Sequence, residues 1–143
     1  MGKDDNLAAW LDQAVDTPWA WGSHDCTIWP ANWVRACGGP DPAEAWRGRY
    51  RTAIGAARLV NAAGGMAELF TAGAAAAGLR GTQRIIAGDV GLIELPARAK
   101  GPMGVAVGAI CIGGGEWAVV RSGGLWLGRA HVTAAWRTPW RTR

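Results

Sequence analysis

The sequence predicts an α+β protein in which helices come first and an antiparallel β-meander follows. Apolar residues recur at helical spacing through roughly the first half of the chain. From Ala87 onward, short β-branched and aromatic runs are divided by Gly-rich turns. No internal repeat or linker divides the sequence, so we expect one domain over residues 1–143.

The first predicted helix covers the apolar residues 7–14, whose spacing places them on one helical face. Asp4 or Asp5 can cap it, because a side-chain oxygen can accept from the free N–H groups of the first turn. Pro18 and Gly22 then interrupt the helical pattern.

Asp25 is a suitable N-cap for a second helix, which "CGGPDP" ends. The stripe predicted on one face of this helix consists of Cys26, Trp29, Trp33 and Cys37. Pro30 has no N–H to bond the carbonyl of residue 26, so we expect a kink in the first turn or two.

Three more helices are predicted before the strands begin. Asp41 and Pro42 have the pattern that starts a short helix. Residues 52–65 form a helix closed by two glycines, and residues 66–79 form a further one. The predicted strands lie in residues 87–95, 103–113, 116–124, 125–130 and, as a last edge strand, 134–140.

Composition and charge exclude several classes of protein. Half of the 143 residues are apolar, which is typical of a globular chain, and no apolar run is long enough to span a membrane. The N-terminal sequence does not read as a signal peptide. Three cysteines without a C-x-x-C pair predict no disulfide framework, and we expect no cofactor and no metal. Cys37 and Cys111 lie in apolar patterns and are expected to be structural.

The ten Trp residues are several times ordinary usage, and some alternate with Arg near the C-terminus. Trp136, Arg137, Trp140 and Arg141 predict a partner-binding segment, because Trp and Arg dominate interface hot spots. The net charge is +4, but no nucleic-acid-binding motif accompanies it, so we do not expect a nucleic-acid partner.

The segment "GSHDC", which leads into a Trp-bearing helix, resembles the nucleophile segment of the NlpC/P60 cysteine peptidases. "AGDVGLIEL" resembles the next landmark of those enzymes. The series "WG..DC..W", "G.DP", "RGRY.TA.GA" and "GG" is more similar to small proteins encoded among phage and prophage tail genes and related to NlpC/P60. The resemblance implies a papain-like fold, with N-terminal helices packed on an antiparallel β-meander or half-barrel.

The resemblance also implies a catalytic site. Cys26 matches the nucleophile, whose thiol a helix N-terminus and an imidazole would activate. Met103 stands where the family has its basic His, and a thioether accepts no proton at neutral pH. His24 lies two residues before Cys26, and side chains at that spacing on a helix point away from each other. His131 is expected at the end of the sheet opposite to Met103 and Cys26. Without a base, Cys26 can equally be a small buried apolar residue.

Two functions follow from these observations. The first is a structural or assembly protein of the phage tail tip, made in the bacterial cytoplasm and carried in the virion, with tail hub or distal-tail proteins as partners. The second is a cysteine hydrolase that cuts peptidoglycan peptides with Cys26.

Overall fold

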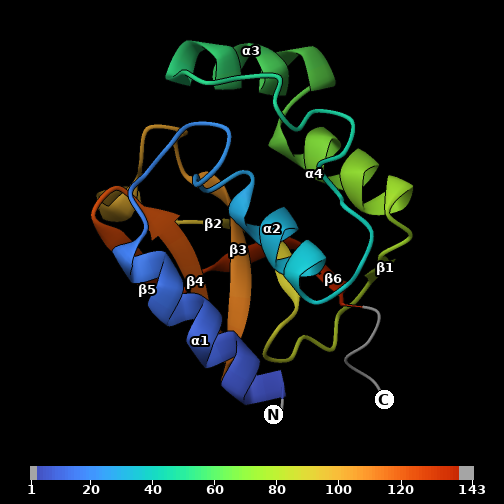
Figure 1. Ribbon diagram of the computed structural model, residues 1–143, viewed down its shortest axis with the longest axis vertical. Coiled ribbons are helices and arrows are strands. Elements are labelled where there is room, and N and C mark those ends of the chain that lie inside the picture. The colour runs from blue at the N-terminus through green and yellow to red at the C-terminus, as the bar shows by residue number, and fades with distance from the viewer. Residues whose placement is uncertain (1–2, 139–143) are drawn as a thin grey trace.

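The computed structural model describes residues 3–138, in which four helices precede a six-stranded sheet (Figure 1). The helices are α1 (Lys3–Asp16), α2 (Trp29–Ala36), α3 (Ala53–Ala63) and α4 (Met66–Ala76). The strands are β1 (Arg80–Gly81), β2 (Val90–Glu94), β3 (Ala106–Gly113), β4 (Glu116–Arg121), β5 (Gly124–Arg129) and β6 (His131–Arg137), with a 3₁₀ turn, η1, over Ala97–Ala99. The predicted order, helices first and strands afterwards, is confirmed.

The helices are placed unequally on the sheet. α1 contacts β5, α2 contacts β3, and α4 contacts β2 and β6, whereas α3 packs on α4 at the top of Figure 1. Thr52 caps α3 by accepting from the Gly55 N–H (3.0 Å), and Gly64 ends it at φ +97°. A glycine is required there, because other residues rarely adopt a positive φ.

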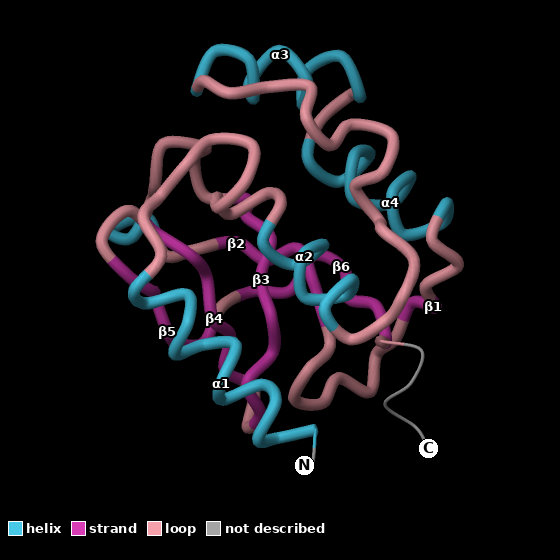
Figure 2. Tube along the Cα trace, in the orientation of Figure 1, coloured by secondary structure: helices cyan, strands magenta, loops and turns pink. Residues whose placement is uncertain are grey.

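The short helix predicted from Asp41 and Pro42 is wrong. Residues 37–52 contain no helix and are drawn as a loop in Figure 2. The Asp41 carboxylate does accept from the Ala43 N–H (2.9 Å), as an N-cap would, but the chain continues as successive turns. Arg47 donates to the same carboxylate and also to Asn32 Oδ1 of α2, and these bonds hold the turns in place against the local helical preference.

Every strand pair is antiparallel, and the sheet order is β1-β6-β2-β3-β4-β5. Ala130 alone separates β5 from β6, although β5 pairs with β4 and β6 pairs with β2. One residue spans at most about 3.6 Å, so the sheet must curl to bring these two strands end to end. The result is a barrel-like sheet with helices on its outer face.

The strand order and register correct two expectations. β6 is not an edge strand, because it lies between β1 and β2. His131, at the start of β6, pairs with Glu94, which pairs in turn with Ala106 at the start of β3. His131 is therefore at the same end of the sheet as the start of β3, not the opposite end, because the curl returns the chain across the sheet.

Both faces of the sheet are buried. Val90, Ile110 and Ala118 face the helices and pack in one cluster with Trp29 and Trp33. The other face lines the inside of the curl, where the ring of Trp117 is 2% exposed and lies against Gly91. A Cβ on Gly91 would approach that ring to 2.8 Å, so the glycine makes room for the tryptophan.

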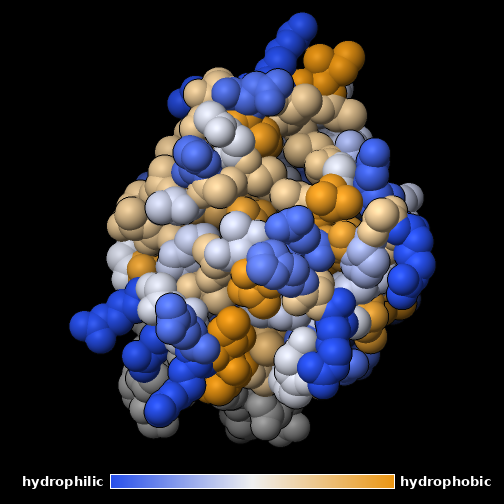
Figure 3. Space-filling model, turned by 180° about the vertical axis from the view of Figure 1, so that it is seen from behind, coloured by the Kyte–Doolittle hydropathy of each residue, from blue (hydrophilic) through white to orange (hydrophobic). Residues whose placement is uncertain are grey.

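The face opposite that of Figure 1 carries hydrophilic side chains toward both of its sides, with apolar residues between them (Figure 3). The large apolar side chains that are exposed are Val15, Ile54 and Leu127. Over the described range 3–138, no helix has the length and apolar character needed to cross a membrane.

Candidate functional site

The carboxylate of Asp25 is the polar centre of the "WGSHDC" segment. It is 1% exposed and accepts four hydrogen bonds. The N–H groups of Thr27 and Ile28 donate to Oδ1, both at 2.9 Å, and the Gly22 N–H donates to Oδ2 at 2.8 Å. The Tyr50 hydroxyl donates to Oδ2 at 2.7 Å. Asp25 thus caps the turn that leads into α2 and connects it to the distant residue Tyr50.

Burial and the neighbouring Asp25 charge raise the pKa of the Tyr50 hydroxyl, which keeps it protonated and donating. Gly22 has φ +86°, and a Cβ there would collide with the Tyr50 carbonyl oxygen. Gly22, Asp25 and Tyr50 therefore form one packed unit. The sequence analysis missed this structural role of Tyr50, although the "RGRY" segment contains it.

An ion pair between Arg47 and Asp41 stabilises the loop beside this unit. Arg47 donates to both oxygens of Asp41, at 2.8 and 2.9 Å, and to Asn32 Oδ1 at 2.7 Å. These bonds hold the pKa of Asp41 below its usual range, against the opposing effect of its partial burial. The motifs "G.DP" and "RGRY" thus contribute residues that connect α2 to the 37–52 loop.

Cys26 lies in the turn immediately before α2, one residue after the capping Asp25. Because Pro30 has no N–H, the Cys26 carbonyl lacks its helical partner; it accepts instead from the Gly108 N–H of β3 (3.1 Å). A Cβ on Gly108 would come within 2.6 Å of that carbonyl. The proline and the glycine together join the start of α2 to the sheet.

The predicted stripe along the second helix is only partly correct. Trp29 and Trp33 of α2 belong to one buried cluster between the helices and the sheet, and Cys37 packs against that cluster. Cys26 belongs to the cluster inside the curl of the sheet instead. The difference arises because the chain bends between Asp25 and Trp29, where Cys26 precedes the regular helix.

A pocket of about 320 Å³ opens beside Cys26 where β3 and β4 separate. The two strands pair from Ile110 and Ala118 toward their shared turn, and not beyond. Cys26 and Met103 both line this pocket, as the alignment of "GPMGVAVG" predicts. Met103 lies in the turn before β3 rather than on the strand. The other lining residues are Trp19, Trp21, Leu95, Gly101, Pro102, Val107, Val119, Val120, Arg121 and Ser122.

The environment of the Cys26 thiol opposes ionisation. The residue is 3% exposed, and burial, with the nearby Asp25 charge, raises its pKa to about 12. A nucleophilic cysteine needs the reverse, a pKa lowered by cationic or helix-dipole neighbours. In this structure, therefore, Cys26 is a protonated thiol at neutral pH.

His24 faces away from Cys26. It lines a separate pocket between α1 and α2, with Trp10 and Gln13 among its neighbours. Burial lowers its pKa, against the opposing effects of a hydrogen bond with the Ala14 backbone and of the Asp25 charge. Its Nε2 has no hydrogen-bond partner within residues 3–138. The His24 side chain is buried.

His131 is exposed, and its Nε2 lies 4.0 Å from Glu94 Oε2. It does not line the Cys26 pocket. The structure therefore brings Met103 to Cys26 and brings neither histidine into that pocket.

Of the four residues predicted to bind a partner, the structure describes Trp136 and Arg137. Trp136 is 9% exposed and packs against Phe70 at 6.5 Å between ring centroids, so it is a core residue and not part of a free surface. The sequence predicted an edge strand here, but β6 lies between β1 and β2, and Trp136 is therefore covered. Arg137 is partly buried opposite Arg80 of β1. Trp140 and Arg141 lie outside the described residues.

The two other cysteines lie in or against the core. Cys111 is 2% exposed and its Sγ accepts from the Gly113 N–H at 3.4 Å. Cys37 is partly buried against the helical cluster. Across the described part of the chain, no three His, Cys, Asp or Glu side chains form a group that could hold a metal ion.

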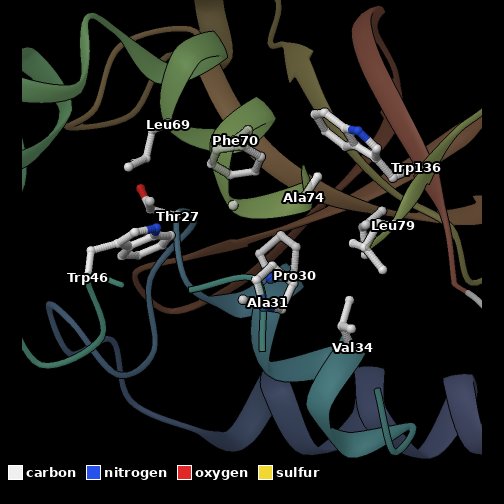
Figure 4. A pocket seen from close by; sticks show the side chains of 13 residues that line it. Thr27, Pro30, Ala31, Val34, Trp46, Leu69, Phe70, Ala74, Leu79 and Trp136 are labelled. Carbon is white, nitrogen blue, oxygen red and sulfur yellow. The ribbon is translucent and has the colours of Figure 1, made fainter. Parts of the chain in front are cut away.

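A second, almost wholly apolar pocket lies between α2, α4 and β6 (Figure 4). Its volume is about 30 Å³, and the side chains that surround it include Trp46, Phe70 and Trp136. The buried Trp46 Nε1 has no hydrogen-bond partner among the described residues. The Thr27 hydroxyl reaches this pocket, but no Asp, Glu, His, Cys or Lys is among the residues that line it.

No curated protein and no solved structure matches the chain. A family model described as "Domain of unknown function (DUF6950)" matches residues 2–138. Because that match covers nearly the whole sequence, the chain belongs to the DUF6950 family.

Proposed function

We propose that this protein is a structural or assembly component of the tail-tip region of a phage, or of a prophage or tail-like particle, on a degenerate NlpC/P60 (papain-like) scaffold. The scaffold proposal rests on the sequence motifs. It is supported by the antiparallel curled sheet, the helices on one face and the position of Cys26 ahead of α2.

One observation carries the non-enzymatic part of the proposal. The Cys26 thiol has a pKa raised to about 12 and shares its pocket with Met103, while both histidines lie outside that pocket. Cysteine catalysis needs a thiolate and a group that transfers a proton to the leaving amine. The pocket supplies neither, and its apolar and aromatic lining suits binding better than hydrolysis.

The alternative function is a peptidoglycan hydrolase with Cys26 as nucleophile. Its support is the capped turn at the start of α2, which places Cys26 beside a pocket as in a thiol peptidase. This alternative requires a rearrangement that exposes the thiol and brings a base to it.

A peptidoglycan digestion assay separates the two functions. Wild-type protein is compared with Cys26→Ala, Met103→His and the matched control Met103→Leu. We expect the wild type to release no more peptide than Cys26→Ala, because loss of a positioned acid–base group lowers rates by about 10²–10⁴-fold. Wild-type cleavage that Cys26→Ala abolishes would establish the hydrolase and refute the proposal.

The tail-tip location has its own test. Purified particles are analysed by mass spectrometry and labelled with antibody to this protein for electron microscopy. Label at the tail tip is expected. Protein present in infected or induced cells but absent from assembling and mature particles would contradict the proposed location.

A further inference from the structure

The pocket beside Cys26 combines aromatic walls with a single charged side chain. Trp19 and Trp21 meet edge to face, with ring centroids 5.1 Å apart and planes at 87°. Met103 adds a flexible apolar surface to the same pocket. Arg121, at the end of β4, is the charged residue that lines it, and no acidic residue does.

Among the side chains that the structure describes, those of residues 6–138, no Asp or Glu lies within salt-bridge distance of Arg121. The carboxylates that lie beside a basic side chain there are Asp41, which binds Arg47, and Glu94, which lies 4.0 Å from His131. Arg121 itself is partly buried. A guanidinium beside apolar walls interacts strongly with a carboxylate, which it can bind through two parallel hydrogen bonds.

The volume limits the size of the occupant. About 320 Å³ is at the lower end of small-molecule pockets and accommodates one large side chain with its backbone, not a helix. Its two polar side chains, Arg121 and Ser122, follow one another on the chain, so the polar end of a ligand has one defined place. The aromatic and Met103 surfaces receive its apolar part.

We propose that this pocket binds an apolar residue with a free carboxylate, as at the C-terminus of a polypeptide, with its side chain against Trp19, Trp21 and Met103 and its carboxylate on Arg121. This inference rests on the proposed function, because it takes the pocket beside Cys26 to be a binding pocket and its occupant to be the chain end of another tail protein. Free aromatic or branched carboxylic acids share the same chemistry.

Isothermal titration calorimetry with defined probes tests the proposal. N-acetylphenylalanine is compared with its amide, and the peptide Ala-Ala-Phe is compared with its C-terminal amide. We expect each free acid to bind about 10-fold or more tightly than its amide, because a hydrogen-bonded charge pair is lost in the amide. Tighter binding of Ala-Ala-Phe than of N-acetylphenylalanine identifies a polypeptide chain end, and equal affinity identifies a small acid.

Three variants make the test specific to the pocket. Arg121→Gln should remove the preference for the acid, and Ser122→Asp, at an exposed position, should weaken acid binding by adding a like charge. Arg129→Gln, an exposed charge on β5, is the matched control and should bind as the wild type does.

Equal binding of acid and amide, no binding up to about 10 mM, or an acid preference that survives Arg121→Gln would overturn the inference. None of these measurements involves hydrolysis. Peptidoglycan cleavage would refute the proposed function without changing them, and their failure would leave the digestion result intact.

Discussion

Asp25 and Cys26 are adjacent in the sequence, yet their side chains lie in opposite environments. The Asp25 carboxylate is buried and receives four hydrogen bonds. The Cys26 thiol is buried beside an apolar pocket, where burial and the Asp25 charge hold it protonated. The "DC" pair that resembles a catalytic motif therefore contains one residue with a clear structural role and one without the electrostatic support that catalysis needs.

This difference separates, within one motif, a residue that organises the fold from a residue whose surroundings keep its thiol protonated. Asp25 organises Gly22, the start of α2 and Tyr50, so its replacement would disturb folding. The backbone of Cys26 also stabilises the fold, because its carbonyl accepts a hydrogen bond from the Gly108 N–H of β3. The backbone of Cys26 is needed for the fold, and its sulfur is not required by any of these contacts.

The largest effect that we predict is on the alkylation rate of the Cys26 thiol. In mildly alkaline buffer we expect iodoacetamide to modify Cys26 about 10³-fold more slowly in the native protein than in urea-unfolded protein. The reason is a pKa raised from 9.0 to about 12, which lowers the thiolate fraction. Peptide mapping separates Cys26 from Cys37 and Cys111. Equal rates in both states would place the thiol in contact with solvent.

Asp25→Ala should be the most destabilising of the substitutions in this region, by about 3–5 kcal/mol in urea unfolding, because several buried donors lose their acceptor. Tyr50→Phe removes one of the four bonds and should lower the free energy of unfolding by about 1 kcal/mol. Cys26→Ala provides the direct comparison and should lower it by about 1–2 kcal/mol. If Asp25→Ala were no worse than Cys26→Ala, the contrast between the two residues would fail.

Gly108→Ala should lower the free energy of unfolding by about 1–3 kcal/mol, because its Cβ would press on the Cys26 carbonyl and the Phe70 ring. Gly81→Ala is the matched control: Gly81 also lies in a strand, but its nearest contact would be an ordinary 3.8 Å. Chemical denaturation measures both. Similar losses in the two variants would mean that strand glycines, and not the junction with Cys26, decide the effect.

The smallest effect that we predict is the contribution of His24 to the pH dependence of the free energy of unfolding. Its pKa is lowered in the folded protein, so the unfolded chain binds a proton more readily. Stability should therefore be unaffected well above 6.5, the ordinary pKa, and should fall as the pH drops through that value toward the folded pKa. Thermal unfolding at several pH values measures this. His24→Gln should flatten the dependence over that range, whereas the exposed His131→Gln should keep it.

The helical half illustrates what local pattern can and cannot predict. Residues 52–65 were predicted as a helix and form α3, because Thr52 caps it and Gly64 ends it without help from distant residues. Residues 41–42 have a similar starting pattern but form turns, because Arg47 binds the Asp41 carboxylate. Pattern alone does not reveal such a competing partner.

The sequence by itself determined the order of elements and the strands of the second half, because periodicity and turn residues are local. It also indicated a capping role for Asp25, which caps the turn before α2 although the helix itself begins after Ile28. The expectation that Met103 lies near Cys26 came from the resemblance to the NlpC/P60 motifs and not from spacing. Only the tertiary structure decided that the sheet curls, that Trp136 is buried, that His131 begins a strand beside β2 and that Tyr50 bonds Asp25. It also decided the state of the Cys26 thiol. Each of these depends on which distant segments meet, and a thiol's pKa is set by the burial and charge that such meetings create.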